Sequence, residues 1–161
     1  MRVAWRITKA RYAEGALSGE GGRLVSGRWH FRGSPVVYLS ETVSLAAMET
    51  FVHLPLKYSA PENEFVLIPV TIPEGVPVTE IPVRKLPNGW DKDPAPESTQ
   101  HLGQQWLDNG ETALLKVPSS VIPRESNYLL NPLHADASRL QASPPEPFDF
   151  DPRMFTSSRC H

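Results

Sequence analysis

Residues Pro35 to His53 read PVVYLSETVSLAAMETFVH and join a short strand to a helix. The apolar run Pro35–Leu39 predicts a short buried strand. The next residues, Ser40-Glu41-Thr42, resemble a helix N-cap with an acid in the first turn. From Thr42 to His53 the apolar residues cover most of the helix circumference, which predicts a buried helix. The strand and the helix are thus both predicted to be buried, and one carboxylate, Glu49, lies in the middle of the helix.

The rest of the chain adds further short strands and one more helix. Strands are predicted at Arg2–Ile7, Glu64–Ile72, Thr112–Val117 and Asn127–Leu130, with an added edge strand within Ser143–Met154. Pro69 inside its strand indicates an edge or a bulge. Ser98–Asp108 predicts a helix that ends at Asn109-Gly110. Gly15–Gly33 is too long for a simple turn and is typical of a functional loop, whereas Val76–Trp90 reads as a proline-rich connection. The predicted fold class is α+β, with more strands than helices.

The composition is that of an ordinary globular domain. Of its 161 residues, 40% are hydrophobic and 21% charged, so we expect one domain over residues 1–155 and a loose tail at residues 156–161. The 17 prolines argue against an all-helical bundle. One cysteine, Cys160, excludes an intrachain disulfide and a zinc site built on paired cysteines. With no apolar run of about 18 residues and no signal-peptide core, we expect a cytoplasmic protein without a membrane partner.

The charges are distributed unevenly along the chain. Residues 1–33 carry seven basic and two acidic side chains, whereas the remainder carries nine basic and sixteen acidic ones, for a net charge of −2. A basic segment on a mildly acidic protein suits a discrete anion such as a phosphate group. It does not suit a nucleic-acid duplex, which usually calls for a strongly basic domain.

Glu49 is the first candidate for chemistry. A carboxylate on a buried helix costs several kcal/mol unless it is paired or faces a cavity. It is therefore a general base, a carboxylate that stabilises a cationic transition state, one half of a structural salt bridge, or an exposed residue on a helix whose boundary is misjudged.

Each of four other candidates has a functional and a structural interpretation. In Ser26–Phe31 the glycine allows close backbone approach and Arg28 offers a planar fork to a phosphate, but the segment also fits a tight turn. Arg6 is a second anion ligand or a solvated strand residue. Tyr38 is a core residue or a stacking platform for an aromatic ring. Ser119 caps a turn or belongs to a site, and without a Gly-x-Ser-x-Gly elbow it is not expected to be a hydrolase nucleophile.

Taken in order, these pieces resemble the RES domain family, which is named for an arginine, a glutamate and a serine. The matching stretches are Trp5-Arg6-Ile7, Ser26–Trp29, Pro35–Glu41, Leu45–Glu49, Val117-Pro118-Ser119, Asn127–Pro132, the region of Trp90 and Gly103–Leu107, and Phe148–Arg153. They cover nearly the whole chain. Many members have Gly-Gly-Arg-Trp-Asn, where this chain has Ser26 and His30 at the first and last positions.

The resemblance implies a split β-core like that of ADP-ribosylating toxins, with helices around an NAD⁺ cleft. It implies the toxin of a type II toxin–antitoxin module that consumes NAD⁺ as a glycohydrolase or phosphorylase. One branch of the family is described as ADP-ribosyltransferases that act on a host metabolic enzyme. The implied partner is an Xre-like antitoxin with a segment that plugs the active site. NAD⁺ is then the substrate, and neither a further cofactor nor a metal is expected.

The resemblance places site residues at Arg6, Arg28, Tyr38, Glu49, Ser119 and Asn131. Cleavage of the nicotinamide–ribose bond passes through an oxocarbenium-like transition state, so the enzyme must hold the diphosphate and place negative charge beside the developing cation. We expect the two arginines to clamp the diphosphate and Tyr38 to stack on the nicotinamide. Glu49 would stabilise the cation, and Ser119 would bind the ribose or carboxamide. Because Ser120 follows Ser119 directly, the position of the site serine stays open.

The sequence also leaves the reaction's outcome open. Water as acceptor gives hydrolysis, phosphate gives phosphorolysis, and a side chain gives protein mono-ADP-ribosylation. A non-catalytic nucleotide-binding module is a further alternative, which predicts NAD⁺ binding without release of nicotinamide.

Overall fold

A computed structural model of the chain describes residues 1–55, 57–59 and 61–155. The predicted tail at residues 156–161, with Cys160, lies outside the described residues. The strands are β1 (Arg2–Lys9), β2 (Val37–Ser40), β3 (Phe65–Ile72), β4 (Val78–Glu80), β5 (Leu114–Pro118), β6 (Ser126–Leu130), β7 (Gln141–Ala142) and β8 (Glu146–Phe148). The α-helices are α1 (Glu20–Leu24), α2 (Val43–Phe51) and α3 (Glu97–Asn109). The α+β prediction is therefore confirmed.

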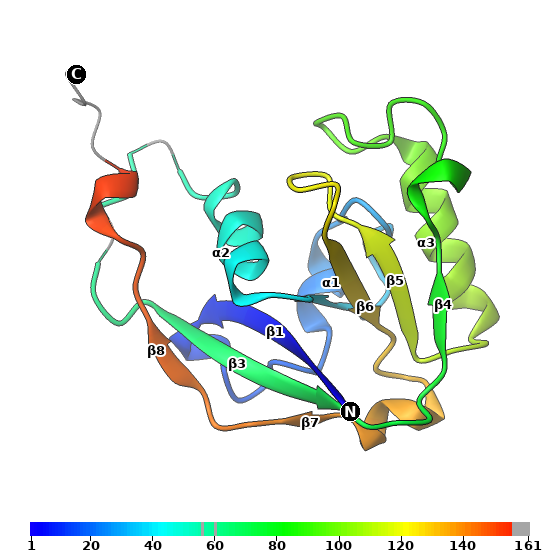
Figure 1. The fold of residues 1–161 in the computed structure, drawn as a ribbon, viewed down its shortest axis with the longest axis horizontal. Helices are drawn as coiled ribbons and strands as arrows, with labels where there is room; N and C mark the ends of the chain where they lie inside the picture. Colours follow the sequence, from blue (N-terminus) through cyan, green and yellow to red (C-terminus); the bar gives the residue numbers. More distant parts are fainter. Residues whose placement is uncertain (56, 60, 156–161) are drawn as a thin grey trace.

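The strands form one sheet that is divided into two halves. Its order is β4-β5-β6-β2-β1-β3-β7, and β8 pairs with β3 beside β7. β1 runs antiparallel to β3 along all eight residues of both strands, whereas β1 and β2 pair only through Trp5 and Ser40. Figure 1 shows the result: the two halves splay apart, α2 stands above β1, and α3 flanks β4 and β5. The predicted split β-core is confirmed.

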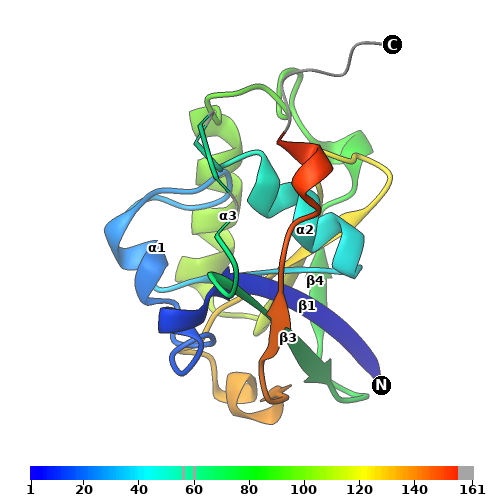
Figure 2. The ribbon, with the colours of Figure 1, turned by 90° about the vertical axis from the view of Figure 1, so that its left-hand side faces the viewer.

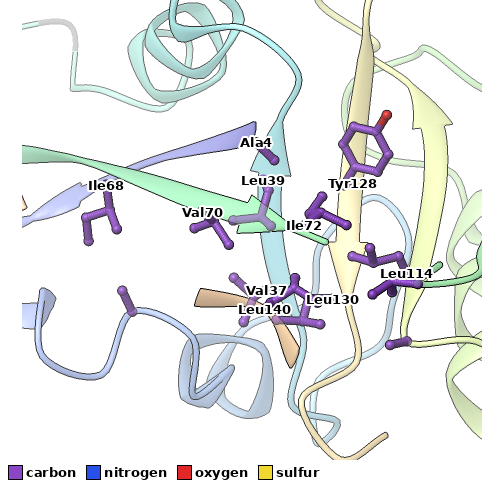
Figure 3. Packing of buried hydrophobic residues seen from close by; sticks show 13 residues of the cluster. Ala4, Val37, Leu39, Ile68, Val70, Ile72, Leu114, Tyr128, Leu130 and Leu140 are labelled. Atoms are coloured by element: carbon purple, nitrogen blue, oxygen red, sulfur yellow. The ribbon is translucent and has the colours of Figure 1, made fainter. Parts of the chain in front are cut away.

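Two hydrophobic clusters hold the described residues together. The larger one joins both halves of the sheet through β1, β2, β3, β5 and β6 (Figure 3). The smaller one lies against α3 and contains Trp29, Trp90 and Trp106. Successive side chains of a strand point to opposite faces, so Leu114 enters the first cluster and Leu115 the second. This explains why β5 and β6 carry buried apolar residues on both faces.

α2 begins as predicted but is less buried than predicted. The N-cap is Thr42, whose Oγ1 accepts a hydrogen bond from the nitrogen of Leu45 at 3.0 Å. Only Leu45 and Ala46 of the helix are buried, and Val52 directly after it is 49% exposed. The expected all-round burial is wrong because one face of α2 packs on the sheet while another borders an open cavity. Figure 2 shows α2 and the turn Pro152–Met154 on the same side of β1 and β3.

The structure corrects the interpretation of Pro69. β3 is an interior strand, with β1 on one side and two short strands on the other. β8 pairs with residues 65–67 of β3 and β7 with residues 70–71, so the partner changes next to Pro69. The Pro69 carbonyl accepts a hydrogen bond from the nitrogen of Ser143, at 2.8 Å, in the connection between these two strands. The missing N–H of proline thus lies on the side where the ladder is interrupted.

Two predicted connections contain regular structure. The Val76–Trp90 connection includes β4, which pairs in parallel with β5. The Gly15–Gly33 loop includes α1, a helix of five residues. Both elements are too short for periodicity to reveal them. No helix in the described part of the chain combines the length and apolar character that crossing a membrane requires.

Candidate active site

A cavity of about 1090 Å³ opens where the two halves of the sheet meet. It lies between β1, α2, the loop 25–29, the segment 91–95 and residues 120–121. Its volume is at the upper end of the roughly 300–1,000 Å³ of small-molecule sites. Four of the predicted site residues line it: Arg6, Arg28, Tyr38 and Glu49.

Glu49 is held from two neighbouring strands. Its Oε1 accepts a hydrogen bond from Ser119 Oγ at 2.7 Å and a second from Asn127 Nδ2 at 2.7 Å. Ser119 directly follows β5, and Asn127 lies on β6. No hydrogen bond from the described residues reaches Oε2, and Glu49 forms no salt bridge with them. The salt-bridge alternative therefore does not apply to the described chain, and the carboxylate is held at the cavity wall.

Ser119 occupies a different place from the one expected. It is fully buried and is not part of the cavity wall. Its Oγ donates to Glu49 and accepts from the nitrogens of Val121 and Ile122, each at 3.0 Å. Ser119 thus lies behind Glu49, where its hydroxyl is already engaged in three hydrogen bonds. The geometry supports a positioning role in place of the expected ribose contact, and it selects Ser119 over Ser120 as the partner of Glu49.

Arg6 reaches the cavity from β1. Its Nη1 donates to the carbonyl of Tyr38 at 3.1 Å. Its Nε is buried and has no hydrogen-bond partner among the described residues. Burial lowers the pKa of the Arg6 guanidinium from its ordinary value, although arginine stays charged at neutral pH. A buried donor without a partner favours the binding of an anion here.

Arg28 ties two cavity-lining segments together. Its Nη1 donates to the carbonyls of Trp90 and Lys92, both at 2.8 Å. This bridge joins the loop 25–29 to the segment 90–92, and residues 91 and 93–95 of the same stretch line the cavity. Within the described chain both hydrogen bonds of Arg28 come from Nη1, so its other nitrogens are available to a ligand.

Tyr38 lines the cavity, and its hydroxyl is bound within the glycine-rich loop. The hydroxyl lies 2.7 Å from His30 Nδ1 and accepts from the nitrogen of Trp29 at 3.3 Å. His30 Nε2 lies 3.1 Å and 3.0 Å from the carbonyls of Gly22 and Val25. Carbonyls only accept, so Nε2 carries the proton and Nδ1 accepts from Tyr38. Tyr38 therefore contributes its ring to the cavity.

His30 is a structural residue that the sequence did not assign. Its side chain is 2% exposed, and burial lowers its pKa, which keeps the ring neutral. Burial also raises the pKa of Tyr38, so the phenol keeps its proton. A Cβ at Gly27 would collide with the Tyr38 hydroxyl and the His30 ring. The motif Ser26–Phe31 is thus a packed anchor for Tyr38 as well as the source of Arg28.

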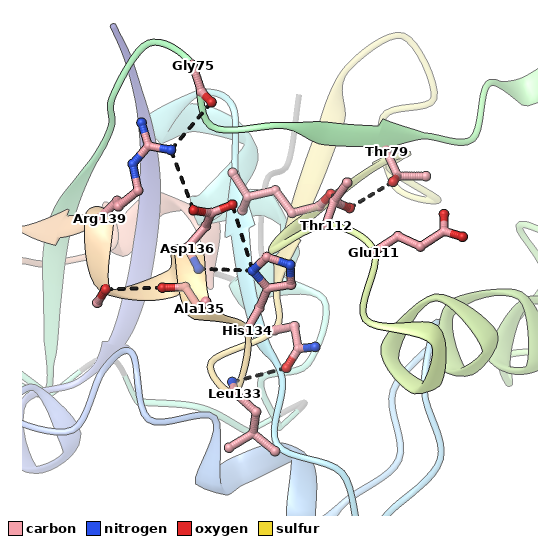
Figure 4. A network of polar contacts seen from close by, with 12 residues as sticks. Gly75, Thr79, Glu111, Thr112, Leu133, His134, Ala135, Asp136 and Arg139 are labelled. Carbon is pink, nitrogen blue, oxygen red and sulfur yellow. Dashed lines mark hydrogen bonds and ion pairs between the residues drawn. The ribbon is translucent and has the colours of Figure 1, made fainter.

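Asn131 does not join the site. Its side chain accepts a hydrogen bond from the nitrogen of Leu133 at 3.1 Å, and it does not line the cavity. Figure 4 shows this turn, with Arg139 and Asp136 paired at 3.5 Å beside it. The expected cofactor contact therefore gains no support from the cavity lining: Asn131 follows the opposite end of β6 from Asn127 and turns the chain there.

Asn127 and Ser40 are the site residues that sequence reasoning missed. Ser40 Oγ donates to Asn127 Oδ1 at 2.8 Å, and Ser40, Glu49 and Asn127 all border the cavity. Neither residue stands in a local motif that predicts chemistry. The described residues contain no group of three or more His, Cys, Asp or Glu side chains placed to hold a metal ion.

Comparisons with known proteins agree with this geometry. The RES domain model matches residues 3–151. A protein named "Toxin Res" from Yersinia enterocolitica is 36% identical over 94% of this chain and 99% of its own length. The "Prs ADP-ribosylating toxin" of Sphingobium sp. (strain YBL2) is 40% identical over 93% of this chain and 94% of its own.

A solved structure supports the fold. A chain of the Mycobacterium tuberculosis MbcT–MbcA toxin–antitoxin complex superposes with a TM-score of 0.70. The match covers 96% of this chain and 86% of that chain at 18% sequence identity. At this identity the likeness is one of fold alone.

Proposed function

Because the chain belongs to the RES domain family, we propose that it is the toxin of a toxin–antitoxin module and consumes NAD⁺ by cleaving the nicotinamide–ribose bond. Full-length similarity to proteins named as toxins supports the first part of this proposal. The name of the Sphingobium relative, an ADP-ribosylating toxin, supports the second part, because ADP-ribosylation breaks this same bond.

The observation that carries the proposed chemistry is Glu49 at the cavity wall, with both donors on one carboxylate oxygen. Cleavage breaks the bond between ribose C1′ and the pyridinium nitrogen. The electron pair leaves with nicotinamide, which departs neutral, and an oxocarbenium-like ribose stays behind. A fixed carboxylate beside this ribose stabilises the developing positive charge. The leaving group is cationic at the start, so neither a general acid nor a metal or further cofactor is required to expel it.

The other cavity residues have complementary tasks. Among the described residues the buried Nε of Arg6 has no hydrogen-bond partner, and Arg28 has nitrogens besides Nη1 to offer, so both arginines suit the diphosphate. The ring of Tyr38 suits stacking on nicotinamide, because its hydroxyl is bound within the loop. Glu49 Oε2 is free to accept from a ribose hydroxyl. Ser119 holds Glu49 from behind.

An acceptor then captures the ribose at C1′. Water loses a proton and gives ADP-ribose, whereas inorganic phosphate gives ADP-ribose 1″-phosphate. The enzyme would act in the cytoplasm, where NAD⁺ is available, and a protein antitoxin of the Xre-like class would hold it inactive. The antitoxin part of this proposal is supported by the fold match to a chain of a toxin–antitoxin complex.

The test is nicotinamide release from NAD⁺ by the purified chain and by Glu49→Gln. We expect the substitution to reduce release by at least about 100-fold, because a neutral amide does not stabilise the cation. Glu14→Gln, an exposed acid elsewhere, serves as the matched control and should keep full activity. Added phosphate that accelerates release and yields a phosphorylated product would identify a phosphorylase. A folded Glu49→Gln protein with full turnover would refute the assignment.

Protein ADP-ribosylation is the second candidate, favoured by the 40% identity to the Sphingobium toxin. It uses the same site but transfers ADP-ribose to a side chain. Labelled NAD⁺ incubated with the chain and a cell lysate separates the two, because only the transferase labels a protein. Binding of NAD⁺ without release or labelling would instead indicate a non-catalytic module.

A further inference from the structure

We infer that Asn127, held in turn by Ser40, is a positioning residue that fixes the Glu49 carboxylate with Oε2 directed to the substrate. The inference rests on the proposed function, because it concerns the orientation of the group that stabilises the cleaved ribose. It assigns a task to two cavity-lining residues to which the sequence analysis gave no role in the site.

Three side chains form a continuous path of hydrogen bonds. Ser40 Oγ donates to Asn127 Oδ1 at 2.8 Å, and Asn127 Nδ2 donates to Glu49 Oε1 at 2.7 Å. Ser40 and Asn127 are 5% and 8% exposed. They are direct register partners on β2 and β6, so the backbone ladder itself fixes their separation. The sheet therefore holds Ser40 and Asn127 in place, and Asn127 in turn positions the side chain of Glu49, which comes from α2.

The chemistry of the groups determines the orientation of the amide. An ionised carboxylate only accepts hydrogen bonds, so the amide nitrogen of Asn127 must face Glu49. The amide oxygen then faces Ser40, whose hydroxyl donates to it. A flipped amide would set its oxygen against the carboxylate and lose the bond to Glu49, whereas the Ser40 hydroxyl could accept from the amide nitrogen. Glu49 thus selects the orientation of the amide, and Ser40 holds the amide in place.

Both donors to Glu49 use the same oxygen. Ser119 and Asn127 approach Oε1 from two adjacent strands, each at 2.7 Å, and hydrogen bonds to a charged group are the stronger ones. Rotation of the carboxylate would break both bonds together. Among the described residues Oε2 accepts no hydrogen bond, so it is the oxygen left for the ribose.

The sharpest variant is Asn127→Asp, which keeps the shape and replaces the donor by an ionisable acceptor. At low pH the new carboxyl holds a proton and donates to Glu49 as the amide did. As the pH rises the proton is lost, and two carboxylates face each other. We expect kcat for nicotinamide release to approach the wild-type value near pH 5 and to fall at least about tenfold below it by pH 8, with KM little changed.

Three further proteins complete the experiment. Asn127→Leu lacks a donor at every pH and should be slow throughout. Ser40→Ala should lower kcat about three- to tenfold at unchanged KM. If the Asn127 variants do not fold, this variant alone tests whether Asn127 positions Glu49. Thr79→Val removes a hydroxyl bonded to Thr112, away from the cavity, and should keep the wild-type pH profile.

The outcomes separate this inference from the proposed function. A wild-type chain that releases no nicotinamide refutes the proposed function, and the inference falls with it. If the wild type is active and kcat of Asn127→Asp follows the wild-type pH profile, or is lowered by the same factor at every pH, the inference is overturned and the proposed function is not. If the Asn127 variants do not fold, wild-type kcat in Ser40→Ala overturns it.

Discussion

Glu49 shows at the scale of single residues how a charge is held at a cavity wall. Hydrogen bonds to a charged group contribute about 1.5–3 kcal/mol each, enough to offset part of the cost of removing a carboxylate from water. Ser119 and Asn127 supply two such bonds without adding a positive charge. A cationic partner would neutralise the carboxylate that the proposed chemistry requires. Neutral donors orient Glu49 and leave its charge available to the substrate.

The two adjacent serines provide a test at this scale. Ser119→Ala removes a donor to Glu49 and an acceptor for the nitrogens of Val121 and Ile122. We expect nicotinamide release to fall at least about tenfold and the free energy of unfolding to fall by about 1–3 kcal/mol. Ser120→Ala removes a cavity-lining hydroxyl that forms no hydrogen bond to Glu49 in the described part of the chain, and it should change both quantities little. Release assays and urea unfolding of both variants measure this, and the reverse order would contradict it.

At the scale of elements, α3 supports the loop that carries Arg28 and anchors Tyr38. Gln100 donates to the carbonyl of Gly27 at 3.0 Å, and Gln104 accepts from the nitrogen of Phe31 at 3.1 Å. Between these two glutamines lies Gly103, where the helix packs directly on the backbone carbonyl of Trp29. The helix thus contributes Gln100 to the cavity lining and holds the neighbouring loop in place.

Two helical glycines test this packing. A Cβ at Gly103 would overlap the carbonyl of Trp29, whereas a Cβ at Gly21 in α1 meets nothing within 4 Å. We expect Gly103→Ala to lower the free energy of unfolding by about 2–3 kcal/mol, near the top of the usual range for overpacking. Gly21→Ala should change it by less than about 1 kcal/mol. Urea midpoints at constant m-value measure both, and equal midpoints would disprove the close helix–loop contact.

At the scale of the whole molecule, the cavity lies near the junction of β1 and β2, where the pairing between neighbouring strands is short. Trp5 and Ser40 form the only register pair between β1 and β2, so few backbone bonds join the two halves. Arg6 belongs to one half, and Arg28 lies on a loop packed beside the other. An anion bound by both arginines would link the halves across the cavity. Ligand binding is therefore expected to stabilise the whole fold.

Thermal unfolding with added ADP-ribose tests this linkage. A ligand at one hundred times its Kd stabilises the folded state by about 2.7 kcal/mol, which raises Tm by several degrees in a chain of this size. We expect this rise in the wild type and its loss in Arg6→Ala, each compared with its own ligand-free Tm. Arg11→Ala, an exposed arginine away from the cavity, should keep the full rise. An equal rise in Arg6→Ala would remove Arg6 from the anion site.

Most of the elements and four residues of the cavity were predictable from the sequence. Apolar spacing and end signals are local, so β1, β3, β5, β6 and α3 were predictable. Arg6, Arg28, Tyr38 and Glu49 were predictable as a set, through the ordered resemblance to the RES domain family. The burial of α2 was overestimated, because periodicity shows which residues are apolar and not what covers them.

The contacts that hold the site depend on the three-dimensional arrangement of the strands. Glu49 meets Ser119 and Asn127 from 70 and 78 residues away, and such contacts depend on strand order and register. The same register places Asn127 at the cavity and Asn131 at the far end of β6. The local sequence around a polar residue on a strand does not show at which end of the sheet its side chain lies. That choice follows from which strands pair, and this is why Ser119 lies behind Glu49 and Asn127 beside it.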